Sequence, residues 1–168
     1  MAILTCVMLV TGMLLWQKAR DNKRYTDAQR KFHYKVTVWF LGICMALFPA
    51  TALLFLANKI IPIELESHKF WCNAVFFGGW LGFIIASILV QRIPKVFSLN
   101  FRVGAVLALL IPVVNGVMTG DWIWVSISEG MGYVAGVDAF WLLTGLIVGG
   151  ASLRKKSLPP PPKDKTNS

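Results

Sequence analysis

The chain has 168 residues, of which 56% are hydrophobic and 15% charged, and its net charge is +9. This composition is too apolar for an ordinary soluble domain and indicates an all-α integral membrane protein. The basic residues lie between long apolar runs and not across one folded face, so the charge does not call for a nucleic-acid partner.

Five apolar runs follow one another along the chain, and we interpret them as membrane spans, because about 20 mostly apolar residues cross the roughly 30 Å of hydrocarbon. They cover residues 2–16, 36–57, 71–91, 103–120 and 133–152. The first is short, about 22 Å as a helix. It has no positive charge before it and no small-residue cleavage site after it, so we interpret it as a minimal or truncated span and not as a signal peptide.

The basic residues predict the orientation of these spans. Fifteen of the 17 lysines and arginines lie in 17–35, in 91–102 or in the tail that follows 152. Five spans place all three stretches on one side of the bilayer, with Lys59 and Lys69 on the other. Because cytoplasmic loops are rich in lysine and arginine, we expect a multi-pass protein with the N-terminus outside and the C-terminus in the cytoplasm.

Aromatic residues and the tail agree with these borders. Trp16, Trp71, Trp122 and Trp124 lie at or near the predicted interfaces, where a tryptophan ring anchors a span. Residues 153–168 form a basic, proline-rich cytoplasmic segment with no apolar face, which we expect to be disordered.

Two polar residues inside the apolar runs are candidate site residues, because amide and ionisable groups within spans are costly. Asn115 and Asp138 lie toward the outer ends of the last two spans and are expected at similar depth. A functional interpretation makes them a paired polar site for a proton, a cation or a donor group of a ligand. A structural interpretation makes Asp138 the cap of the last helix and lets Asn115 accommodate the backbone that Pro112 opens.

The two histidines are expected on opposite sides of the membrane, so they do not ligate one haem between them. His33 falls in the basic flank and is interpreted as an interfacial, solvated residue. His68, with Glu64 and Glu66 nearby, gives a weak case for a metal contact on the outer side.

Several motifs in order resemble a known family. They are VTGMLLWQKAR, FPATALLFLANKIIP, FWCNAVFFGGW, LALLIPVVNGVMTGDW and AGVDAFWLLTG. The order resembles the C-terminal membrane part of PepSY-associated transmembrane-helix proteins, in which a TG-x-x-LW segment ends one helix and a P-x-x-N-x-x-T segment leads to GDW and an AG-x-D-like helix. The resemblance covers nearly all of the chain outside the proline-rich tail.

This resemblance implies a bacterial inner-membrane component of iron acquisition, related to ferric-siderophore reductases that carry haem in the membrane. Asn115, Asp121 and Asp138 match the family pattern and are the candidate pocket residues that it implies. The family's preceding helices and its PepSY regions, which carry most of its histidines, have no counterpart in this sequence. Haem is therefore expected only with a PepSY-type membrane partner or an upstream region, and the chain alone is not expected to be an active reductase.

The sequence is compatible with two functions. The first is a membrane module, or a split or truncated part, of a ferric-siderophore reduction or iron-uptake system. The alternative is a non-catalytic membrane scaffold or assembly protein, in which the polar groups only fix helix packing.

Overall fold

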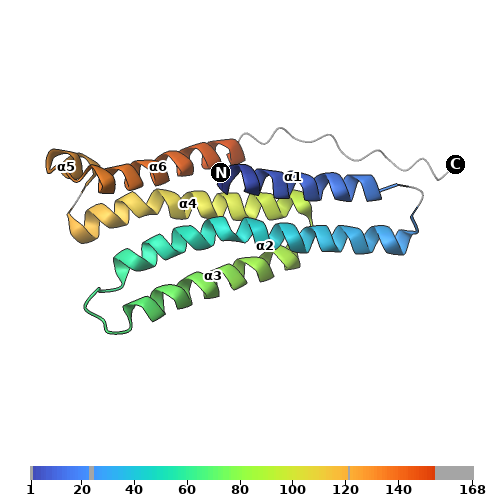
Figure 1. The fold of residues 1–168 in the computed structure, drawn as a ribbon, viewed down its shortest axis with the longest axis horizontal. Coiled ribbons are helices and arrows are strands. Elements are labelled where there is room, and N and C mark those ends of the chain that lie inside the picture. Colours follow the sequence, from blue (N-terminus) through green and yellow to red (C-terminus); the bar gives the residue numbers. More distant parts are fainter. Residues whose placement is uncertain (1, 23–24, 121, 154–168) are drawn as a thin grey trace.

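A computed structural model describes residues 2–22, 25–120 and 122–153, and all regular structure in these ranges is helical. The six helices are α1 (Ala2–Arg20), α2 (Asp27–Ile60), α3 (His68–Val90), α4 (Ile93–Thr119), α5 (Ile123–Ser128) and α6 (Gly132–Leu153). The long helices run up and down beside one another, and the short α5 joins α4 to α6 at one end (Figure 1). The all-α class is confirmed for the described residues.

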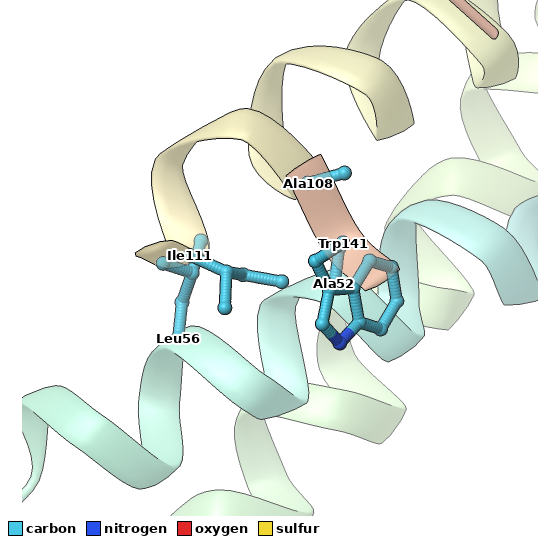
Figure 2. Packing of buried hydrophobic residues seen from close by; sticks show 5 residues of the cluster. All are labelled: Ala52, Leu56, Ala108, Ile111 and Trp141. Carbon is cyan, nitrogen blue, oxygen red and sulfur yellow. The ribbon is translucent and has the colours of Figure 1, made fainter. Parts of the chain in front are cut away.

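Helices α2 and α4 form the centre of the bundle. α2 packs against α1, α3 and α4, whereas α6 packs against α4 and α5. The core cluster joins α2, α4 and α6 (Figure 2). It consists of Ala52, Leu56, Ala108, Ile111 and Trp141. The alanines let α2 and α4 approach closely, and the large Trp141 ring of α6 fills the space beside them.

Four helices within the described residues are long and apolar enough to cross a membrane, namely α2, α3, α4 and α6. Only a small part of the apolar stretch of α3 is buried inside the bundle, which leaves most of its apolar surface for lipid. Such helices are apolar all round because lipid solvates one side and the bundle the other. The chain is thus compatible with a multi-pass membrane protein.

The first predicted span, 2–16, lies within α1, which has 19 residues and extends to Arg20. This helix begins about midway along the bundle and runs to the end where α2 begins (Figure 1). Its length corresponds to about 28 Å, and its last turn carries Lys18 and Arg20. α1 is not among the four candidate spans, so a fifth crossing stays a prediction.

The helices extend beyond several predicted span borders. α2 begins at Asp27 and not near residue 36, and α4 begins at Ile93 and not near residue 103. Thr26 and Gln29 form a capping box that starts α2, and Pro94 lies in the first turn of α4. Leu153 still belongs to α6, and the rest of the predicted tail, 154–168, lies outside the described residues.

Charges gather at the two ends of the bundle. We call the basic end the one where α1 and α3 end and α2 and α4 begin (Figure 1). Its described basic residues are Lys18, Arg20, Arg30, Lys31, Lys35, Arg92, Lys95 and Arg102. The opposite end carries Lys59, Lys69, Glu64, Glu66 and Glu129. This segregation matches the charge pattern from which the orientation is predicted.

Candidate functional site

Asn115 of α4 and Asp138 of α6 meet inside the bundle. The Asn115 Nδ2 donates a hydrogen bond to the Asp138 Oδ2 over 2.6 Å. Asn115 is 0% exposed and Asp138 is 3% exposed. The two residues therefore form a buried carboxyl–carboxamide pair, which we call the Asn115–Asp138 pair.

Helix geometry places this pair near the opposite end of the bundle. Asn115 lies four residues before the end of α4 at Thr119, about 6 Å along the axis. Asp138 lies six residues after the start of α6 at Gly132, about 9 Å along its axis. The capping alternative for Asp138 is wrong, because α6 begins six residues earlier and Asp138 is inside the helix.

Further groups surround the pair. The Thr119 Oγ1 donates to the Asn115 carbonyl oxygen over 2.8 Å and also lies 3.4 Å from the Asn115 Oδ1. The Trp122 ring covers Gly116, where an added Cβ would lie 2.6 Å from a ring carbon. The pair thus has a polar neighbour on α4, and an aromatic ring covers the glycine that follows Asn115 in the chain.

This arrangement allows two kinds of chemistry. A carboxyl group held by an amide donor inside a span is a group that accepts a proton or a cation, and intramembrane carboxyl groups mark such sites. The same hydrogen bond also joins α4 to α6, as polar side chains do between membrane helices. Asp121, the third candidate pocket residue, lies outside the described residues.

A second buried polar contact lies toward the basic end. Asn100 of α4 donates through Nδ2 to the Ser87 Oγ of α3 and to the Val96 carbonyl oxygen, both over 2.9 Å. Its Oδ1 is buried and has no hydrogen-bond partner among the described residues. The sequence does not single out Asn100, because this residue lies before the predicted span 103–120, in the basic stretch 91–102.

His68 joins the end of α2, the following loop and α3. Its Nδ1 lies 3.2 Å from the Pro62 carbonyl oxygen, and its Nε2 lies 3.1 Å from the Asn58 Oδ1 and 3.5 Å from the Cys72 Sγ. Within the described ranges, no three histidine, cysteine or acidic side chains are grouped to hold a metal. His68 therefore connects the end of α2, the loop after it and the start of α3. A metal contact at His68 stays a prediction.

His33 lies at the basic end among aromatic rings. Trp16, Tyr25 and Phe32 have ring centroids 5.2, 5.7 and 5.9 Å from that of His33. The His33 Nδ1 is buried without a hydrogen-bond partner in the described part of the chain. His33 is thus half-buried in an aromatic cluster and not simply solvated, and His68 lies at the opposite end of α2.

The four predicted anchors lie at helix ends. Trp16 is near the end of α1, with the Arg20 guanidinium 4.7 Å from its ring centroid. Trp71 is in the first turn of α3 and is exposed. Trp122 and Trp124 stack at the start of α5, with ring centroids 5.2 Å apart. These positions suit rings that lie at a membrane interface.

The comparisons with known proteins add no relative. No protein-family model, curated protein or solved structure matches this chain.

Proposed function

We propose that this chain is the membrane module of a system that reduces or takes up ferric-siderophore complexes. In this proposal it lies in the inner membrane with five spans, the N-terminus outside and the basic end in the cytoplasm. The order of motifs shared with PepSY-associated proteins supports the iron assignment. The charge segregation between the two ends supports the orientation.

The observation that carries the proposal is the contact between Asn115 and Asp138. Both residues come from segments on which the resemblance rests, and they meet over 2.6 Å although 23 residues separate them. The pair lies about one to two helical turns inside the end that faces outward in this orientation. Its role is to hold a proton, a cation or a donor group of the ligand near the outer face.

A partner supplies the electron-carrying cofactor in this proposal. His33 is near the start of α2 and His68 is beyond its end, so about 40 Å of helix separates them. One haem iron cannot bind both rings across that distance. The purified chain is therefore expected to show no haem absorption, and a bis-histidine haem spectrum from the chain alone would contradict this division of roles.

A specific observation favours a second candidate, a non-catalytic scaffold. Asn115 and Asp138 are buried and hydrogen-bonded to each other, which is also how a purely structural helix clamp is built. A structural clamp and a site differ in what they require. The clamp needs only a hydrogen-bond acceptor at position 138, whereas the site needs the carboxyl group itself.

Asp138→Asn separates the two candidates, because an asparagine at this position still offers an oxygen to Asn115. We expect a strain that lacks the gene to grow poorly when ferric siderophore is its iron source. The wild-type chain should restore growth, and D138N should not, although the protein accumulates to the normal level. Glu129→Gln makes the same chemical change at an exposed position of the same end and should restore growth fully.

Growth restored by D138N would favour the scaffold. Loss of folded protein in D138N, seen by size-exclusion chromatography of the solubilised chain, would contradict the site assignment, because it would show that the carboxyl group is needed for folding. Normal growth of the deletion strain on ferric siderophore would overturn the iron assignment itself.

A further inference from the structure

A cavity of about 580 Å³ opens at the basic end between α2 and α3. It exists because α2 continues past the point where α3 ends. α2 has 34 residues, about 51 Å of helix, whereas α3 has 23 residues and ends at Val90. Gln91, with a left-handed φ of 50°, turns the chain away there and lines the cavity. The size of the cavity lies in the range of small-molecule sites.

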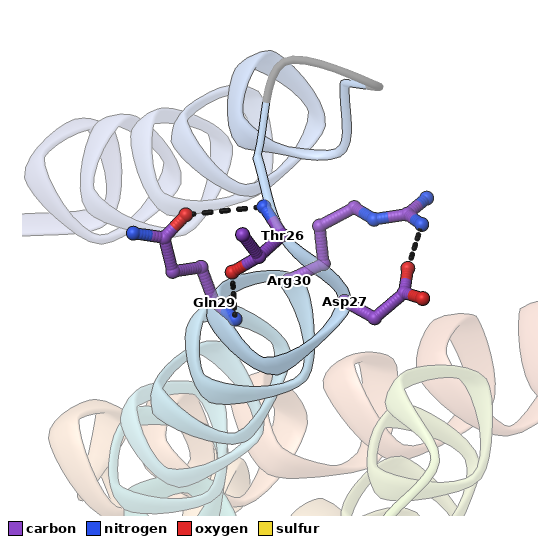
Figure 3. Close-up of polar contacts among 4 residues, drawn as sticks. All are labelled: Thr26, Asp27, Gln29 and Arg30. Carbon is purple, nitrogen blue, oxygen red and sulfur yellow. Dashed lines mark hydrogen bonds and ion pairs between the residues drawn. The ribbon is translucent and has the colours of Figure 1, made fainter.

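The outer part of this cavity is basic. Its lining includes three basic side chains, Arg30, Lys31 and Lys35, and one acidic side chain, Asp27. Asp27 is paired with Arg30 next to the capping box that starts α2 (Figure 3). This excess of positive charge suits an anion.

The inner part of the cavity is apolar. Val38 and Trp39 of α2 and Ile88 of α3 line it, and Trp39 is exposed. From Asp27 to Trp39 the lining extends about 18 Å along α2. The cavity thus changes from charged to apolar along the direction in which a bilayer changes from headgroups to hydrocarbon.

Tyr34 fixes the position of the cavity relative to the neighbouring helix. It lines the cavity, and its hydroxyl oxygen accepts a hydrogen bond from the Ile93 N–H at the start of α4 over 3.3 Å. α2, the turn after α3 and the start of α4 are therefore joined at the mouth of the cavity.

We propose that this cavity binds one anionic phospholipid. The phosphate contacts Arg30, Lys31 and Lys35, and an acyl chain lies along Val38, Trp39 and Ile88. A zwitterionic lipid fits less well, because its own cation meets the excess of positive charge. Free phosphate fits less well too, since it leaves the apolar part of the cavity unfilled. The proposal does not depend on the iron assignment.

Lipid binding to the full chain tests the proposal. In neutral detergent we would measure the shift of the unfolding temperature with added phosphatidylglycerol, phosphatidylcholine or inorganic phosphate. Phosphatidylglycerol should stabilise the chain saturably, and the other two should not. The double variant Lys31→Gln/Lys35→Gln should bind phosphatidylglycerol about 30-fold more weakly, which corresponds to about 1 kcal/mol for each removed charge.

The matched control is Arg92→Gln/Lys95→Gln, which removes the same charge from the same end at residues that do not line the cavity. It should keep the affinity within about threefold, because neither side chain lines the cavity and exposed charges without direct contact contribute little. Equal weakening by both double variants would overturn the proposal, because it indicates a general surface charge effect. Stabilisation by inorganic phosphate as strong as that by the lipid would overturn it as well.

A second measurement tests the acyl-chain part independently of the lysines. Phosphatidylglycerol with brominated acyl chains should quench tryptophan fluorescence at low lipid content, and Trp39→Phe should remove most of this quenching. Brominated phosphatidylcholine should quench only at higher lipid content. Identical quenching of wild type and W39F by brominated phosphatidylglycerol would contradict the placement of the chain along Trp39.

Discussion

Asn115 and Asp138 are both buried, and one hydrogen bond joins them between α4 and α6. Removing either side chain takes this hydrogen bond from a buried polar group, which costs about 1–3 kcal/mol. Replacing both by apolar side chains of similar shape avoids most of this penalty. The pair is therefore a contact whose coupling is measurable by a double-mutant cycle.

We expect Asp138→Leu and Asn115→Leu each to lower the free energy of unfolding in mixed micelles by about 1–3 kcal/mol. The double variant should lose clearly less than the sum of the single losses, by about 1 kcal/mol of coupling. Asp138→Asn keeps an acceptor and should lose less than either leucine variant, within about 1 kcal/mol of wild type. Strictly additive losses would show that the two side chains do not interact in the folded protein.

The sequence placed Asn115 and Asp138 at similar depth because both lie a few residues inside the ends of apolar runs. Because α4 and α6 pack against each other, two residues at the same depth on these helices can come into contact. The capping alternative failed because it needs the helix to begin after Gly136, whereas Gly136 lies inside α6. The contact of Asn100 with Ser87 was not predictable in the same way, since Asn100 is outside the apolar window although it is fully buried.

At the scale of elements, α4 and α6 approach each other at a glycine. An added Cβ at Gly145 would lie 2.7 Å from the Leu109 Cγ and 3.1 Å from the Ala105 carbonyl oxygen. The backbone oxygen cannot move aside as the end of a flexible side chain can. Small residues at such crossings are typical of membrane helices.

Gly145→Ala should therefore push α6 away from α4 and destabilise the folded chain by about 1–3 kcal/mol in detergent unfolding. Gly150→Ala, five residues further along the same helix, is the matched control because a Cβ there meets no atom within 4 Å. It should not lower the free energy of unfolding and should raise it by up to about 1 kcal/mol, because alanine favours a helix over glycine. Equal effects of both variants would indicate that α4 and α6 are not packed as described.

The extent of the helices was predictable only for their lipid-facing parts. Hydropathy detects the residues that contact hydrocarbon, so it gave residues 36–57 and 103–120 for helices that begin at Asp27 and Ile93. The additional turns depend on local chemistry, namely the capping box at Thr26 and Gln29 and the proline in the first turn of α4. The short helix α5 lies in a stretch with no long apolar run and was not predicted.

At the scale of the whole molecule, the separation of charge between the two ends predicts the orientation in the membrane. Position 31 lies at the basic end and position 66 at the opposite end. In a variant without native cysteines, Glu66→Cys should react with a membrane-impermeant maleimide in intact spheroplasts. Lys31→Cys should react only after permeabilisation. The reverse pattern would contradict the proposed orientation.

The central claim is that the Asp138 carboxyl group serves the handling of ferric siderophore. Its most direct test is the accumulation of radiolabelled iron, supplied as ferric siderophore, in the cytoplasm of deletion cells that carry wild type, D138N or Glu129→Gln at equal folded protein levels. We predict that wild type and the Glu129 variant restore accumulation and that D138N leaves it at the level of the deletion strain. Full accumulation with D138N, or no difference between the deletion and wild-type strains, would contradict the claim.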